Sequence, residues 1–288
     1  MNRHGFTLIE LLIGLILTSV VALSIYQVLV NNQRVHRVQT ERIDLNATLR
    51  AAVSIIPAEL REMNASDTAE SDIAAMSANS ITYKAMRTMN FVCAPPTSAG
   101  TSGSVIVARS PSFGLRGLSV ARDSVVIFAE AAPNIRGDNH WVHANVTGIS
   151  AGTACTGGGA SITLTLDGVS PSGGLAGVYE GAPVRGYEML QLLTYADGLG
   201  DVWMGARQFT KGGGWSTTQP LLGPLQVSGI QFSFFDRTGA ATATPANVAR
   251  IGVTAIGLTT EPVRAGGTLA RVSDTLTTHV ALRNNARN

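Results

Sequence analysis

The sequence predicts an α+β protein in which a long N-terminal helix packs on a mainly antiparallel β-sheet head. Three observations predict it: an apolar run of 25 residues covers Phe6–Val30, an apolar stripe at helical spacing follows it, and short alternating segments separated by turns fill the remainder. With 288 residues the chain can bury a sizeable core, either as one large domain or as two.

The apolar run is long enough to span a membrane. A helix of 25 residues, at about 1.5 Å per residue, measures about 37 Å and exceeds a hydrocarbon core of ~30 Å. It fits a plain membrane anchor. It also fits a secretory signal peptide, with Arg3 and His4 as the basic start and Ala22-Leu23-Ser24 as the cleavage site, and maturation would then leave a chain that begins at Ile25.

Glu10 is a charged residue within the apolar run, and neither of these two explanations requires it. A carboxylate in a spanning helix costs on the order of 2.5–3.5 kcal/mol, so its default meaning is functional. A signal peptide has no use for it. Near the end of an anchor the Glu10 side chain could reach the membrane surface, so the plain anchor remains an alternative explanation.

The segment Gly5-Phe6-Thr7-Leu8-Ile9-Glu10 resembles the cleavage and methylation motif of type IV prepilins and type II secretion pseudopilins. The resemblance implies that a prepilin peptidase removes the leader Met1–Gly5 by cutting between Gly5 and Phe6. It also implies N-methylation of Phe6 and a role for Glu10 in assembly. Cleavage would create an ammonium on Phe6 in the same low-dielectric layer as a carboxylate. Opposite charges attract strongly there, so Glu10 of one subunit can neutralise Phe6 of a neighbour.

Two features depart from this pattern. Arg34, Arg37 and Arg42 follow the apolar run while only Arg3 precedes it, so the arginine count alone does not place the N-terminus in the cytoplasm. In the family the cleavage takes place on the cytoplasmic side, which implies a periplasmic head. Many major pilins carry a proline in the membrane half of the helix, whereas the first proline here is Pro57.

Beyond Val30 an amphipathic pattern extends the helix to about Met63, and Pro57 is expected to kink it or begin its last section. The residues predicted to pack on the head are Val35, Val38, Leu45, Leu49, Ala52, Ile56, Leu60 and Met63. The expected organisation is a leader at 1–5, a transmembrane assembly helix at 6–30, an amphipathic helix at 31–65 and a periplasmic β-rich head at 66–288.

The head is predicted to consist of strands. They are expected at Ser104–Ala108, Ser124–Ala129, Trp141–Val146, Ser161–Leu166, Tyr187–Tyr195, Val202–Phe209, Leu225–Phe235, Ala249–Leu258 and Thr277–Leu282. Asp197-Gly198-Leu199-Gly200 is predicted to be a hairpin turn. Clusters of small and turn-forming residues predict loops at 95–103, 152–160, 168–174 and 211–218.

Composition excludes some functions and indicates a compartment. Charged residues make up only 14% and the net charge is +2 with scattered basic residues, so nucleic acid binding is not predicted. The two cysteines, Cys93 and Cys155, are predicted to form a disulfide if the head is exported, and two buried free thiols are the alternative. The bond would close a loop of about 60 residues and stabilise the fold by roughly 4 kcal/mol.

No constellation predicts an enzyme, a cofactor or a metal site. His140 and His143, with Asp138 nearby, would point to opposite faces of a strand. Asp197 and Asp201 could hold Ca²⁺, but a turn is the stronger interpretation. The runs Gly157–Gly159 and Gly212–Gly214 lack the Lys-Ser/Thr of a phosphate-binding loop. The three tryptophans are expected to pack rather than bind a ligand.

The head is similar to the larger PilW-type minor pilins in length, in the Ile55–Arg61 helix end and in the closing residues Val280–Asn284. The resemblance implies a minor pilin that takes part in assembly, priming or the tip of a type IV pilus. A minor pseudopilin of type II secretion and a membrane-anchored periplasmic binding or adhesive domain are the alternatives. The expected partners are prepilin peptidase, other minor and major pilins or pseudopilins, inner-membrane lipid and the inner-membrane assembly platform. The expected location is the inner membrane, then the cell-surface pilus.

Overall fold

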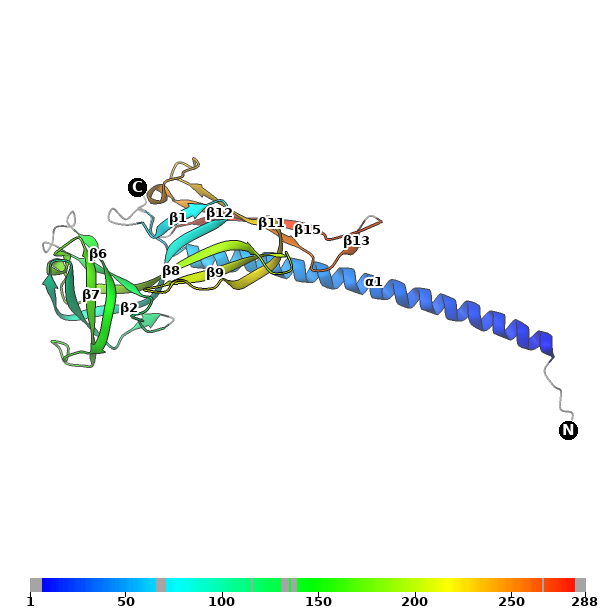
Figure 1. Ribbon diagram of the computed structural model, residues 1–288, viewed down its shortest axis with the longest axis horizontal. Helices are drawn as coiled ribbons and strands as arrows, with labels where there is room; N and C mark the ends of the chain where they lie inside the picture. Colours follow the sequence, from blue (N-terminus) through cyan, green and yellow to red (C-terminus); the bar gives the residue numbers. More distant parts are fainter. Residues whose placement is uncertain are drawn as a thin grey trace, which may run out of the picture.

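A single helix, α1 (Leu8–Leu60), projects from an elongated β-rich head in the computed structural model (Figure 1). Its 53 residues give a rod of about 80 Å. The N-terminal part of α1 is exposed throughout and is long and apolar enough to cross a membrane. The structure describes residues 7–65, 71–114, 116–130, 135, 139–265 and 267–282, with the side chain of Ala265 left out.

The C-terminal half of α1 packs on the head as the amphipathic pattern predicted. The buried side chains of the helix and the turn after it include Leu45, Leu49, Ala52, Ile56, Leu60 and Met63. Val35 was wrongly assigned to this face, because contact with the head begins further along the helix and leaves Val35 53% exposed. Pro57 lies inside the last helical turn, and its carbonyl accepts a hydrogen bond from the Arg61 N–H.

The head is built from β-strands whose described pairings are all antiparallel, which confirms the predicted fold class. The strands are β1 (Ile73–Ser77), β2 (Ser80–Ala99), β3 (Ser102–Ala108), β4 (Phe113–Gly114), β5 (Ser124–Ala129), β6 (His140–Ala151), β7 (Ser161–Ser170), β8 (Pro183–Ala196), β9 (Val202–Thr210), β10 (Gly214–Trp215), β11 (Gln219–Phe235), β12 (Arg250–Leu258), β13 (Val263–Ala265), β14 (Thr268–Ala270) and β15 (Ser273–Ala281). Two short 3-10 helices are η2 (Gly174–Gly177) and η3 (Pro245–Asn247).

These strands form two lobes. The sheet lobe is the open sheet β1-β2-β8-β9-β11-β12-β15, which receives α1 on one face. The barrel lobe is the closed ring β2-β3-β7-β6-β5-β8, completed by the pairing of β2 with β8. Each lobe has its own hydrophobic core, and Leu175 of η2 is fully buried in the core of the barrel lobe. In Figure 1 the barrel lobe lies beyond the C-terminal end of α1.

Strands β2 and β8 belong to both lobes. They pair continuously from Ser80↔Leu193 to Phe91↔Pro183, with one register shift between Met86 and Thr88. On its other side, β8 pairs with β5 through residues 184–187 and with β9 through residues 190–196. The two lobes are therefore joined by continuous strands rather than by a linker.

The sequence analysis missed six strands, β1, β2, β4, β10, β13 and β14, and the loop expected at 95–103 was wrong. Strand β2 runs to Ala99 and β3 begins at Ser102, so most of that segment pairs within the sheet. Other expectations are confirmed: β5 has the predicted bounds, and residues 197–200 form the turn between β8 and β9. The turn-forming residues misled because Pro95 and Pro96 lie at a register shift between Ala94 and Thr97, an irregularity at which a strand tolerates proline.

Candidate functional site

The candidate functional site is the start of α1. Thr7 is the N-cap residue, with extended backbone, and it forms a reciprocal capping box with Glu10. The Thr7 N–H and hydroxyl each donate to Glu10 Oε2 at 2.9 Å, and the Glu10 N–H donates to Thr7 Oγ1 at 3.3 Å. Gly5 and Phe6, the predicted cleavage and methylation residues, lie outside the described residues.

This geometry gives Glu10 a local role that the sequence analysis did not identify. The Thr-x-x-Glu spacing at the start of an apolar run is the signal that could have found it. Its hydrogen bonds with Thr7 satisfy part of the carboxylate, which lowers the cost of holding it in an apolar segment. Of the two carboxylate oxygens of Glu10, only Oε2 accepts a hydrogen bond from a described residue. Oε1 is therefore available to another partner.

The helix surface beyond Glu10 suits a lipid environment. Its side chains are exposed and almost wholly apolar from Leu11 to Leu29. The Thr and Ser hydroxyls are satisfied within the helix: Thr18 donates to the Gly14 carbonyl, Ser19 to the Ile16 carbonyl and Ser24 to the Val20 carbonyl. Satisfying polar groups internally is the requirement for a segment that spans a bilayer.

A row of alternating charges connects α1 to the barrel lobe. Arg87 on β2 contacts Glu59 on α1 at 3.4 Å and Glu188 on β8 at 2.6 Å. Arg116 contacts Glu188 at 3.0 Å and Asp123 at 2.6 Å. We name these five residues the charge row. Its members are far apart in sequence, so no local pattern could have revealed it.

Burial and ion pairing shift the pKa values of the two arginines of the charge row and of the neighbouring Tyr83. Burial opposes the charge of Arg87, but its hydrogen bond to Glu188 and the nearby Glu59 carboxylate outweigh this and raise its pKa. The hydrogen bonds to Asp123 raise the pKa of Arg116. Burial, reinforced by Glu59, raises the pKa of Tyr83, whose hydroxyl donates to Glu59 at 3.4 Å. Arg87 and Arg116 therefore remain charged, and Tyr83 remains neutral, near pH 7.

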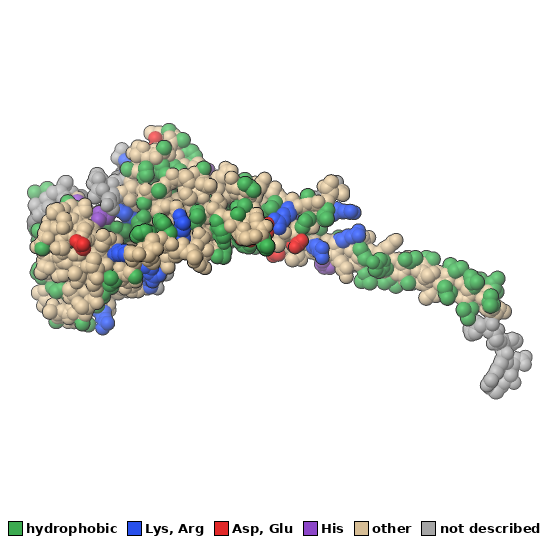
Figure 2. Space-filling view, viewed as in Figure 1, with side chains coloured by type: hydrophobic (Ala, Val, Ile, Leu, Met, Phe, Trp, Pro, Cys, Tyr) green, Lys and Arg blue, Asp and Glu red, His purple; other side chains and the backbone are tan. Residues whose placement is uncertain are grey.

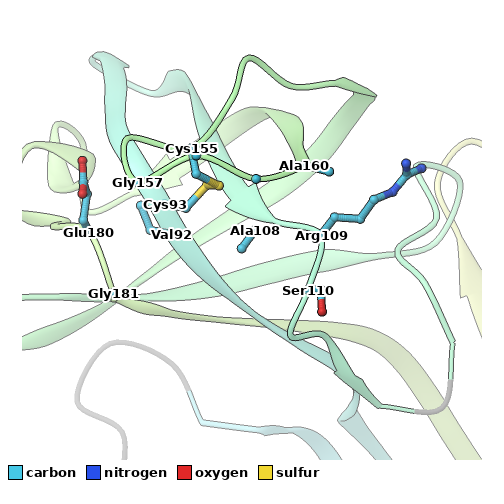
Figure 3. Close-up of a pocket in the computed structure, with 12 residues that line it drawn as sticks. Val92, Cys93, Ala108, Arg109, Ser110, Cys155, Gly157, Ala160, Glu180 and Gly181 are labelled. Atoms are coloured by element: carbon cyan, nitrogen blue, oxygen red, sulfur yellow. A yellow bond between two sulfur atoms is a disulfide. The ribbon is translucent and has the colours of Figure 1, made fainter.

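Cys93 on β2 and Cys155 form a disulfide in the barrel lobe, with their Cα atoms 5.0 Å apart. The bond ties the C-terminal half of β2 to the glycine-rich loop before β7. Beside it lies an open pocket of about 510 Å³ (Figure 3). In Figure 3 the side chains of Arg109 and Glu180 lie on opposite sides of this pocket and do not converge. Glu180 also accepts a hydrogen bond from the Thr156 hydroxyl at 2.6 Å. The pocket thus lacks a converging set of polar groups.

Within the described part of the chain, no group of three or more His, Cys, Asp or Glu side chains is arranged to hold a metal ion. His140 and His143 both lie on β6, three residues apart, and Asp138 falls outside the described residues.

The residues considered for calcium form a turn instead. Asp197 Oδ1 accepts from the N–H groups of Leu199 and Asp201 at 2.8 and 3.0 Å, and Oδ2 accepts from Trp203 Nε1 at 2.9 Å. Asp201 forms an ion pair with Arg271. Both carboxylates are therefore engaged in holding the end of the β8–β9 hairpin.

Comparison with known protein families identifies a short N-terminal motif. The prokaryotic N-terminal methylation motif matches residues 1–26, which include Gly5, Phe6 and Glu10. None of the curated proteins or solved structures compared with the chain matches it. The match covers the predicted leader and the first part of the apolar helix, and it stops well before the head. The chain thus begins with the N-terminal methylation motif that is typical of the type IV pilin and pseudopilin superfamily.

Proposed function

We propose that the chain is a minor pilin-like structural subunit that takes part in assembly, priming or the tip of a type IV pilus. The observation that carries this proposal is the methylation motif at residues 1–26, which leads directly into one continuous helix. The first half of α1 is exposed and apolar, and its second half packs on the head. In this proposal the protein is not an enzyme, the helix is held in the inner membrane, and the head lies in the periplasm.

The geometry of Glu10 supports a role in subunit assembly. Cleavage between Gly5 and Phe6 would place an amine next to the capping box, and N-methylation would leave it cationic. Because Oε2 already accepts from Thr7, the second oxygen of the same carboxylate can accept from the Phe6 ammonium of a neighbouring subunit. Such a pair in a low-dielectric layer is strong and directional, so it would set the axial register between helices.

The shape of the head favours the tip or the priming complex. The barrel lobe extends beyond the C-terminal end of α1 (Figure 1). It therefore adds volume to the head on the side away from the membrane helix. Repeated stacking along a fibre would have to accommodate this lobe in every subunit. A terminal position has to accommodate it only once. The partners in this proposal are prepilin peptidase, other minor and major pilins, and the inner-membrane assembly platform.

A minor pseudopilin of type II secretion is the second candidate, because the same methylation motif is typical of pseudopilins. The two functions differ in phenotype rather than in processing. Loss of the gene should abolish surface pili in one case and secretion of folded exoproteins in the other.

The mass of the mature chain tests the processing. We expect a chain that begins with N-methylated Phe6. A chain that begins at Ile25 would indicate signal peptidase cleavage. A chain that retains Met1 in cells with active prepilin peptidase would indicate a plain anchor. Either result would overturn the proposal.

Two substitutions at Glu10 test assembly. Glu10→Gln preserves an oxygen acceptor for Thr7 but removes the charge, whereas Glu10→Ala removes both. We expect both variants to be cleaved at Gly5 and both to be absent from sheared pili or pseudopili. If Glu10→Gln is incorporated like the wild type, Glu10 acts through capping alone and the proposed pairing with Phe6 is wrong.

A further inference from the structure

Two arginines of α1 follow directly after its apolar segment. Arg34 and Arg37 lie about 6 and 10 Å beyond Val30 along the helix, at about 1.5 Å per residue. The polar headgroup layer of a bilayer is about 5–8 Å thick on each side. If α1 spans the membrane as proposed above, both guanidinium groups lie within reach of lipid phosphates.

A hairpin of the head reaches the same level. The hairpin formed by β13 and β14 is fixed to α1 at its base, where the Glu261 N–H donates to Glu41 Oε2 at 3.0 Å. Val263 of β13 is only 2% exposed. Figure 1 shows the hairpin lying along α1 and pointing toward the N-terminal end of the helix. The head therefore extends one short hairpin toward the membrane.

The outer face of this hairpin combines a cation with an apolar side chain. Arg264 and Leu269 are direct cross-strand partners, so their side chains lie on the same face. That face is opposite to the one that buries Val263. Arg264 is exposed, and Leu269 is 69% exposed. We call Arg34, Arg37, Arg264 and Leu269 the membrane-proximal rim.

The three arginines of the rim have no ion-pair partner in the part of the chain that the structure describes, whereas the nearby Arg271 is paired with Asp201. Glu41 and Glu261 are acidic residues at the base of the hairpin, and Glu41 accepts the backbone N–H of Glu261 there. In Figure 2 basic side chains gather where the apolar helix leaves the head.

We propose that the membrane-proximal rim binds the phosphate groups of anionic phospholipids in the periplasmic leaflet of the inner membrane. This proposal rests on the proposed function, because it requires α1 to be inserted in the bilayer. Arginine pairs with phosphate through two parallel N–H···O bonds, and an adjacent leucine can enter the interfacial layer. The contact holds the head upright on the membrane before assembly. It is released when the helix leaves the bilayer for the filament.

Hydrogen exchange of the full chain in nanodiscs tests this proposal. One set of discs contains phosphatidylcholine only, and the other contains phosphatidylglycerol as well. We expect backbone amides of segment 259–272 to exchange about threefold more slowly in the phosphatidylglycerol discs, and 0.5 M salt to remove most of the difference because such contacts are screened. Adding inorganic phosphate to the phosphatidylcholine discs should give no protection, because the proposed ligand is a lipid headgroup.

Two matched triple variants distinguish the rim from general charge. The first variant combines Arg34→Gln, Arg37→Gln and Arg264→Gln. It should lose the difference in hydrogen exchange between the two sets of discs. The second variant combines Arg61→Gln, Arg109→Gln and Arg237→Gln, which removes the same charge from exposed positions elsewhere. It should retain the difference in exchange. Equal exchange in both discs for the inserted wild-type chain, or equal loss in both triple variants, would overturn the rim proposal alone. A chain that does not remain in the discs would overturn the proposed membrane function, and the rim proposal with it.

Discussion

Arg87 Nε and Glu188 Oε1 lie 2.6 Å apart at the point where β2 and β8 pass from the sheet lobe into the barrel lobe. Their side chains are only 12% and 7% exposed. The same Glu188 carboxylate also binds Arg116 from the barrel side, at 3.0 Å. One carboxylate therefore holds two guanidinium groups at the junction, between a lobe that packs on α1 and a lobe that does not.

Replacing Glu188 should destabilise the junction. Glu188→Ala leaves two largely buried guanidinium groups without one of their partners, and breaking a buried pair in this way typically costs about 3–5 kcal/mol. The measurement is the free energy of unfolding of the full chain in detergent micelles, followed by near-ultraviolet circular dichroism. The control is Asp201→Ala, which breaks the more exposed pair with Arg271 and should cost below about 1 kcal/mol. Equal losses in the two variants would contradict the importance of the charge row.

Adjacent isoleucines on α1 provide a test of helix docking. Ile56 is 1% exposed and lies in the core of the sheet lobe, while Ile55 is 51% exposed. Ile56→Ala should reduce the free energy of unfolding by about 2–5 kcal/mol, because it removes buried methyl groups and leaves a cavity. Ile55→Ala should change it by no more than about 0.5 kcal/mol, as expected for a surface position. Urea denaturation of both variants measures the difference, and a reversed order would contradict the observed helix face.

Removing the disulfide should weaken the barrel lobe. The bond joins residues 62 apart, and loop entropy predicts a loss of roughly 4 kcal/mol for Cys93→Ser with Cys155→Ser. Because both cysteines lie in the barrel lobe, amides of β6 and β7 should exchange faster in the variant while those of β12 change little. Hydrogen exchange with mass spectrometry makes this comparison. Uniform acceleration in both lobes would show that the lobes unfold as one unit.

The stability of the turn after β11 should depend on pH because of the Asp236 carboxylate. The Thr238 hydroxyl, at 2.7 Å, and the N–H groups of Thr238 and Ala240 donate to its Oδ1 and lower its pKa. A lowered pKa in the folded state means that this stabilisation is present above the ordinary Asp pKa of about 3.9 and is lost as pH falls through the folded value. A titration of the Asp236 carboxyl by NMR should therefore show a midpoint below the ordinary value.

Thr238→Val provides the control for this titration. It removes the hydroxyl that makes the largest contribution, so the midpoint should move upward toward the ordinary value. An unchanged midpoint would show that the hydroxyl does not contribute.

The sequence predicted the helix and most of the strands because their signals are local. Phe6–Val30 is mostly apolar with Glu10 as its one charged residue, the buried positions of α1 recur at helical spacing, and β5 is a short run rich in β-branched residues. The same holds for the start of the functional site, where six consecutive residues carry the motif.

The two lobes and the charge row could not be predicted in this way. Residues 81–85 of β2 are buried on both faces, so the strand lacks the alternation that marks a half-exposed strand. Its division between two cores depends on pairing with β8, about a hundred residues later. The partners of Arg87 lie 28 and 101 residues away along the chain, and only the folded register brings them together.

The continuous strands that join the two lobes determine how the molecule would respond to mechanical force. In Figure 1 strand β8 runs along the long axis from the barrel lobe toward α1. Hydrogen bonds of an antiparallel pair are perpendicular to the strands. Tension applied between the membrane helix and the distal lobe would therefore be carried across the junction along the backbones of both strands, with the bonds between them lying across the direction of pull. A head built in this way would transmit a pull from its far end to the helix without yielding at the junction.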